Sequence, residues 1–86
     1  MEEVRLISTK NLHSCTIFYF NNQSIVSVDK LDNNGECNWE CIIGGDEERQ
    51  MTGTLWFNHN KLVEDPDFTF DIPELRIALE FLGYEL

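Results

Sequence analysis

Five stretches of the chain have the apolar, β-branched and aromatic residues typical of β-strands, and the clearest of them alternates apolar and polar positions as a half-buried strand does. The stretches are residues 3–8, 13–20, 24–31, 36–43 and 51–58. The fourth is the clearest, because one of its faces carries Cys37, Trp39, Cys41 and Ile43. The other face carries Asn38, Glu40 and Ile42. A short further segment at 62–64 follows a polar turn, so we expect five or six strands.

Short polar segments at 21–23, 32–35 and 58–61 separate these stretches. Connections of this length join antiparallel neighbours, because parallel strands need a crossover of a dozen or more residues. In the second segment, Asn34-Gly35 predicts a primed turn, since Asn-Gly supplies two residues with positive φ. Residues 44–50 are expected to form a charged, flexible hairpin loop. The strands are therefore predicted to form a meander.

Near the end of the chain, the period of the apolar positions changes from two to about 3.6, which indicates a helix. One helical face carries Leu75, Ala78, Leu79 and Leu82. A helix this short is marginal alone and gains its stability by packing that face on the sheet. The predicted fold class is α+β, an antiparallel β-meander of five or six strands with one C-terminal α-helix. Residues 1–86 are expected to form a single small domain.

Both ends of this helix carry recognisable signals. Asp71 is a candidate N-cap, and Glu74 lies three residues on, where it would complete a capping box. Pro73 suits the first helical turn, where its missing N–H leaves no hydrogen bond unmade. Gly83 is expected to end the helix, and Tyr84 to pack back on it.

Charge is the least usual feature of the composition. Sixteen acidic residues accompany six basic ones, which gives a formal net charge of −10. From position 44 onward there are ten acids and three bases. Direct binding to nucleic acid, which depends on neutralising phosphates with Lys and Arg, is disfavoured. A basic protein, including one whose own groove holds nucleic acid, is the favoured partner.

Two acidic segments and one tryptophan form the candidate partner surface. Glu47, Glu48 and Glu64 have no evident role in a turn or a cap, and exposed loops commonly carry recognition. The alternative is that the 44–50 loop is only a solvated hairpin tip. Trp56 alternates with apolar neighbours, so it lies either on a sheet face that one helix leaves uncovered or in a two-layer core. The candidate partner-binding residues are Asp46, Glu47, Glu48, Glu64, Asp65, Asp67 and Trp56.

Metal and cofactor binding have little support in the sequence. Cys37 and Cys41 are spaced C-x3-C, which on a straight strand places the two sulfurs about 13 Å apart, too far for one metal. We predict that both are inert core thiols and that neither a metal nor another cofactor binds. The acidic run that begins at Asp65 has Thr69 and Phe70 where a calcium-binding loop needs an acid and a glycine.

Catalysis has one weak candidate. His13 and Cys15 are two residues apart, on one face of the predicted second strand. Nucleophilic catalysis needs an activated thiolate and an orienting third group, and the acidic field disfavours a thiolate. We therefore predict no catalytic residue and no enzymatic activity. His59, in a polar turn, is expected to be exposed.

The remaining expectations concern location and function. The chain starts Met1-Glu2-Glu3 with no apolar signal segment, and no stretch is long enough to span a membrane. Three cysteines fit a reducing cytoplasm better than a disulfide framework. We predict a small acidic interaction factor, of the inhibitor or immunity type, that binds a basic protein. The alternatives are a housekeeping or structural domain whose acidity serves only solvation, and a ligand-binding or enzymatic domain that uses His13 and Cys15.

Overall fold

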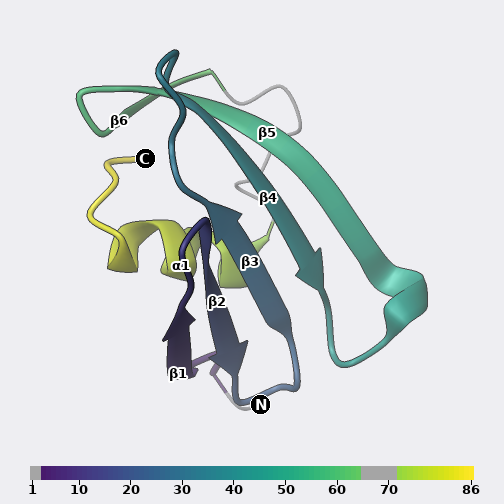
Figure 1. The fold of residues 1–86 in the computed structure, drawn as a ribbon. Coiled ribbons are helices and arrows are strands. Elements are labelled where there is room, and N and C mark those ends of the chain that lie inside the picture. The colour runs from purple at the N-terminus through teal and green to yellow at the C-terminus, as the bar shows by residue number, and fades with distance from the viewer. Residues whose placement is uncertain (1–2, 65–71) are drawn as a thin grey trace.

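The computed structural model describes residues 3–64 and 72–86, which form a curved antiparallel sheet with one α-helix against it (Figure 1). The strands lie in the sheet in chain order, from β1 to β6. Each strand pairs antiparallel with the next. The predicted α+β meander with a C-terminal helix is confirmed.

The elements have these bounds: β1 Leu6–Asn11, β2 Cys15–Phe20, β3 Ile25–Asp29, β4 Glu36–Ile42, η1 Glu47–Arg49, β5 Gln50–Asn58, β6 Lys61–Glu64 and α1 Pro73–Phe81. The 3₁₀ turn η1 was not predicted, and the first strand was predicted too early, at 3–8. The Leu12 amide donates to the Cys15 carbonyl at 2.8 Å in a tight turn, and pairing therefore continues to Asn11. Lys10 and Asn11 belong to the strand because their backbones pair with β2, although both side chains are polar.

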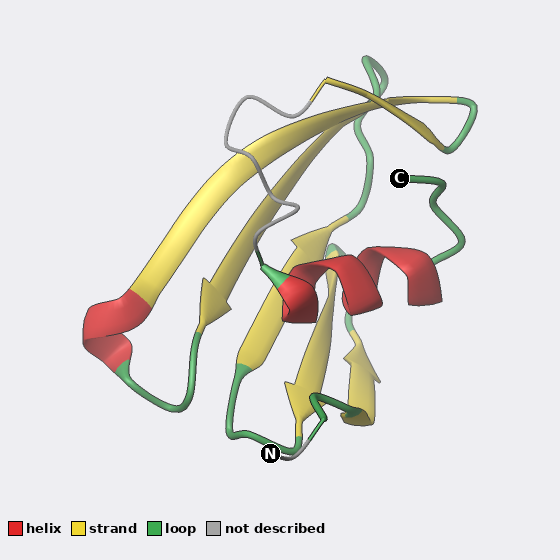
Figure 2. Cartoon of the chain, turned by 180° about the vertical axis from the view of Figure 1, so that it is seen from behind, coloured by secondary structure: helices red, strands yellow, loops and turns green. Residues whose placement is uncertain are grey.

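The core lies between α1 and the face of the sheet that it covers, called here the inner face (Figure 2). The buried apolar side chains of this face are Phe18, Phe20, Val26, Val28, Cys37, Trp39, Cys41, Leu55 and Phe57. The helix adds Leu75, Ala78 and Leu79, which confirms the predicted apolar face. Leu82 was expected on that face but is 36% exposed, because it follows the last residue of the helix.

The β3–β4 connection differs from the predicted primed turn. Of the Asn34-Gly35 pair, only Gly35 has a positive φ, +80°. The Asp32 carboxylate accepts hydrogen bonds from the amides of Glu36, at 2.9 Å, and Asn34, at 2.8 Å. These bonds lower the pKa of Asp32 below its ordinary value. The prediction was wrong because a side-chain acceptor organises this turn, so Asn34 does not need the left-handed conformation.

Two consecutive positive φ values occur instead between β5 and β6, at His59 (53°) and Asn60 (66°). This combination is what a type I′ turn requires. His59 is exposed, as predicted. The end of the chain then pairs with this hairpin. The Leu62 amide donates to the Glu85 carbonyl, and the Glu85 amide donates to the Asn60 carbonyl, both at 2.8 Å.

The first described residue of the helical segment is its N-cap, Ile72, whose side chain makes no capping hydrogen bond. Asp71, the predicted cap, lies outside the described residues. Pro73 is the first helical residue, as predicted. The Glu74 side chain is buried and accepts a hydrogen bond from Ser24, the residue before β3, instead of returning to the start of the helix.

The C-terminal end of the helix follows the prediction. Gly83 has a φ of +91°, and the Tyr84 amide donates to the Leu79 carbonyl at 3.1 Å. The Tyr84 ring stacks on Phe57 with 4.3 Å between centroids. This contact fastens the segment after the helix to β5.

Leu79→Ala should reduce the free energy of unfolding by about 2–5 kcal/mol, because it opens a cavity beneath a helix that depends on this contact. Urea denaturation followed by circular dichroism measures the loss. Glu80→Ala, on the exposed side of the same helix, is the matched control and should change stability by about 0.5 kcal/mol or less. Equal effects of the two substitutions would contradict the packing described above.

Gly35→Ala should destabilise the protein more than Gly44→Ala, although both glycines have positive φ. A Cβ at Gly35 would lie 2.2 Å from the Phe57 carbonyl oxygen, whereas one at Gly44 would meet nothing within 4 Å. We expect a loss of about 1 kcal/mol at Gly44 from the φ angle and about 3 kcal/mol or more at Gly35. Thermal denaturation of the two variants side by side tests this order.

Candidate functional site

The face of the sheet opposite α1, called here the open face, gathers apolar and acidic side chains from several strands. Its composition follows from strand register. Tyr19 pairs with Ile25, and Ile25 pairs with Ile42, so these three lie in one row across β2, β3 and β4. Ile17, Ser27, Glu40 and Thr52 form the next row, from β2 to β5.

The first row and its neighbour Ile17 form an apolar strip. We define the strip as Ile17, Tyr19, Ile25 and Ile42. Ile25 is 37% exposed and the other three are half-buried. Single exposed apolar residues are common on protein surfaces, whereas contiguous ones mark a place of contact. The strip is therefore the part of the open face most suited to burial against another molecule.

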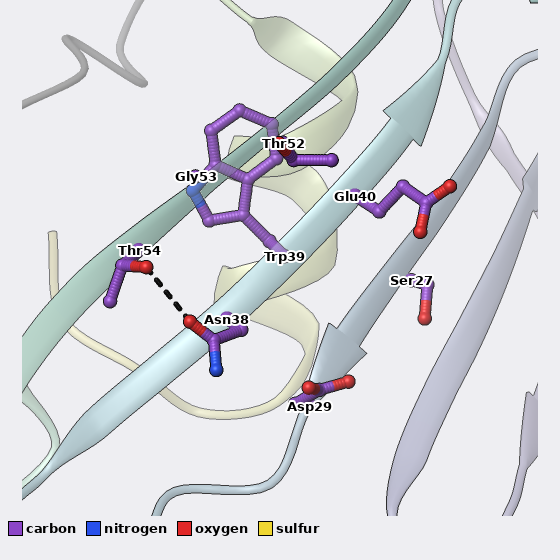
Figure 3. A pocket seen from close by; sticks show the side chains of 8 residues that line it. All are labelled: Ser27, Asp29, Asn38, Trp39, Glu40, Thr52, Gly53 and Thr54. Atoms are coloured by element: carbon purple, nitrogen blue, oxygen red, sulfur yellow. Dashed lines mark hydrogen bonds between the residues drawn. The ribbon is translucent and has the colours of Figure 1, made fainter.

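A polar depression of about 350 Å³ lies beside the strip, over β3, β4 and β5 (Figure 3). Its polar side chains are Ser27, Asp29, Asn38, Glu40, Thr52 and Thr54. Most of these are short, which is why the surface is hollowed here. Thr54 donates to the Asn38 side-chain oxygen at 2.8 Å, and the Gln50 amide donates to Glu40. Within the described part of the chain, the Asp29 carboxylate has neither a hydrogen bond nor an ion pair.

The two tryptophans lie on opposite faces of the sheet. Trp39 is 4% exposed and pairs with Gly53, whose missing side chain leaves room for the indole (Figure 3). Its indole N–H is buried and has no hydrogen-bond partner among the described residues. Trp56 is half-buried and pairs with Glu36, so it belongs to the open face, the first of the two placements considered from the sequence.

The acidic finger, defined as Asp46, Glu47 and Glu48, lies at the tip of the β4–β5 hairpin, and all three residues are exposed (Figure 1). The Asp46 carboxylate caps η1 by accepting from the Glu48 amide at 3.0 Å. Asp46 thus has a local structural role. Among the described residues, nothing hydrogen-bonds or pairs with the Glu47 and Glu48 side chains, which leaves both carboxylates available to a partner.

The predicted partner-binding residues do not form one cluster. The acidic finger precedes β5, and Trp56 lies near the other end of that strand, about 20 Å away at the usual strand rise. Glu64 pairs with Trp56 across β5 and β6. Asp65 and Asp67 lie outside the described residues. Strand register determines these neighbours, and the sequence alone does not reveal it.

Sequence reasoning missed three acids of the open face: Asp29, Glu36 and Glu40. The alternation of residues 36–43 placed Glu40 on the face of its strand that does not carry the cysteines. It did not indicate that residues of β3 would be its neighbours. Ser27 pairs with Glu40, and Asp29 is the next residue of β3 that faces the same way. The available signal was the alternation of residues 25–29 themselves, which sets Ser27 and Asp29 on one face.

Cys37 and Cys41 are fully buried, as the alternation predicted. Burial raises the pKa of the Cys37 thiol to about 12, with a further contribution from Asp29. Burial also raises the pKa of the Cys41 thiol to about 11, helped by Glu74 and Glu40. The Cys37 thiol donates to the Asp29 carbonyl at 3.3 Å. Both groups are therefore neutral thiols at physiological pH, with little nucleophilic character.

His13 and Cys15 were expected to share one strand face, and the structure contradicts this. His13 is exposed in the turn before β2, and β2 begins at Cys15, which is half-buried. The tight β1–β2 turn takes His13 out of the strand. Among the residues that the structure describes, no group of three or more His, Cys, Asp and Glu side chains is arranged to hold a metal ion.

A buried polar contact joins the helix to the sheet. Glu74 is 4% exposed and Ser24 is 1% exposed. The Ser24 hydroxyl donates to the Glu74 carboxylate at 3.4 Å and accepts from the Gly44 amide at 2.9 Å. Three segments that are distant in sequence meet here, which explains why neither partner was predicted. The contact positions the start of the 44–50 loop, and with it the acidic finger.

Comparisons with protein-family models, curated proteins and solved structures find no match to this chain. No described helix has the length and apolar character needed to cross a membrane.

A thiol reagent at neutral pH should modify one thiol per native molecule quickly and all three after unfolding, because only Cys15 is partly accessible. Ellman's reagent gives both counts. Cys15→Ser should remove the fast reaction and leave only the slow modification of Cys37 and Cys41. Rapid labelling of native Cys15→Ser would show that the buried thiols are more accessible than the structure indicates.

Proposed function

We propose that this protein is a small acidic interaction factor, of the inhibitor or immunity type, that binds a basic protein partner. The observation that carries the proposal is the acidic finger, whose Glu47 and Glu48 side chains are exposed and make no hydrogen bond or ion pair within the described residues. A carboxylate at an exposed hairpin tip can contact a cation while its other side stays hydrated, so binding costs it little desolvation free energy.

Net charge supports the same conclusion. A charge of −10 exceeds the magnitude of about 2–8 that solubility asks of a small domain. Such a field speeds the approach of a cationic protein and repels nucleic acid. A partner that itself binds nucleic acid would present the complementary surface, and we propose that class as the target.

The cysteines support a reducing compartment, which we propose is the cytoplasm. All three are free thiols, and two of them are buried in the core. Disulfides are rare where thiols are kept reduced, and buried free cysteines there behave as small apolar residues.

Charge reversal at the finger, Glu47→Lys with Glu48→Lys, should slow association with the partner about tenfold or more at low ionic strength. The dissociation rate should change less, because exposed charges act mainly on encounter. The partner is first recovered by affinity capture from the source cells at low salt, and surface plasmon resonance then gives both rate constants. At about 1 M salt, where the Debye length is about 3 Å, the difference should largely disappear.

The matched control is Glu80→Lys with Glu85→Lys, which changes the net charge equally at exposed positions away from the finger. Equal slowing by both double variants would mean that only net charge matters. Unchanged association of the finger variant would reject the proposal and favour the housekeeping alternative, in which the acidity serves only solvation.

A further inference from the structure

Strand β2 is apolar on both of its faces, although α1 covers only one. Its inward residues Phe18 and Phe20 are buried in the core. Its outward residues Ile17 and Tyr19 lie in the apolar strip of the open face. A strand with a continuous apolar run is typical of sheets that are covered on both sides. The sequence of β2 therefore fits a sheet whose open face becomes covered.

The open face also carries an acidic half beside the apolar strip. Asp29, Glu36 and Glu40 lie on the part of this face formed by β3 and β4. Among the described strands, register places two bases on the open face, Lys10 on β1 and Lys61 on β6, and neither lies on β3 or β4. A second copy of this chain, docked face to face, would bring carboxylates against carboxylates. Charge complementarity therefore selects a cationic partner over self-association.

We propose that the open face is a docking surface for a basic amphipathic helix of the protein partner. The apolar side chains of that helix cover the apolar strip, and an arginine at its border enters the polar depression. This inference rests on the proposed function, because it assigns the basic partner a second contact apart from the acidic finger.

The dimensions of the strip suit a helix. Tyr19, Ile25 and Ile42 lie on three adjacent strands, which span about 10 Å at the usual strand separation. Two turns of an α-helix rise about 11 Å, so apolar residues one turn apart can meet all three side chains. A helix added here would complete a three-layer arrangement, with the sheet between α1 and the partner.

The lining of the depression suits a guanidinium. Asp29 offers a carboxylate with no partner among the described residues, and Glu40 engages one Gln50 amide. Figure 3 shows that the Asp29, Glu40 and Ser27 side chains border one side of the same hollow. A guanidinium has five donors in a plane and pairs with carboxylates through two hydrogen bonds, whereas an ammonium acts as a point charge. Arginine is therefore preferred to lysine.

The test uses the full chain, labelled with nitrogen-15, and a synthetic amphipathic helical peptide with a leucine stripe bordered by arginines. Nuclear magnetic resonance titration should shift the amides of β2, β3 and β4 in a saturable manner. Replacing the arginines of the peptide by lysines should weaken binding about threefold or more, and replacing them by glutamates should abolish it.

Two variants separate the halves of the surface. Asp29→Asn with Glu40→Gln should weaken binding about tenfold and remove most of its salt dependence. Ile25→Thr with Ile42→Thr should weaken it about tenfold and leave the salt dependence in place. Glu80→Gln with Glu85→Gln, at exposed positions outside both the open face and the acidic finger, is the matched control and should alter peptide affinity less than about twofold. Each variant is first shown to melt cooperatively.

Several results would overturn the inference. One is a set of shifts centred on the acidic finger or on α1, and another is equal binding of the glutamate peptide. A third is a dimer at high protein concentration whose interface shifts lie on the open face, since that would make a second copy the occupant. Failure here together with slowed association of the charge-reversed finger variant would leave the proposed function standing. Peptide binding together with an unaffected finger variant would retain the docking surface and reject the finger.

Discussion

Burial of Leu75, Ala78 and Leu79 against the inner face of the sheet is the contact on which the rest of the structure depends. A helix of nine residues does not persist in water without such a contact. The meander, in turn, needs a second layer, because a sheet with both faces in water has no core. Each element therefore depends on the other for its stability.

The same contact explains why the two faces of the sheet differ. The helix is long enough to cover the inner face of the early strands, and Figure 2 shows it crossing there. It leaves the open face with a mixture of apolar and acidic side chains. Trp56 and Ile25 are thus large apolar side chains that remain partly exposed to solvent on the open face. The described strands therefore present a surface with apolar and acidic parts on this side of the sheet.

Much of the architecture could be predicted from the sequence. Alternation in residues 36–43 identified the buried cysteines and Trp39, and the helical period identified Leu75 and Leu79. Both signals are repeated over several residues, so errors at one position matter little. The predicted beginning of β1 was wrong, because it depends on a single local hydrogen-bonding choice. The β3–β4 turn failed for the same reason, since the carboxylate of Asp32 organises it.

The candidate site was harder to predict than the fold. The acidic finger is one continuous segment and was visible in the sequence. The polar depression draws Asp29, Glu40 and Thr54 from three strands, and these become neighbours only when the register is known. The Ser24–Glu74 contact joins residues far apart in the chain, and no local pattern marks either one.

Strand order has a consequence for how the molecule assembles. Each strand pairs with the next one along the chain, so every pairing in the sheet closes only a short loop and costs little chain entropy. The contacts of α1 with β1 and β3, and of Glu74 with Ser24, close far longer loops. We expect hairpins to form first and the helix to dock late. Until docking, the newly formed sheet exposes its apolar inner face as well as the apolar strip of the open face, and the strong negative charge of the chain then keeps neighbouring molecules apart.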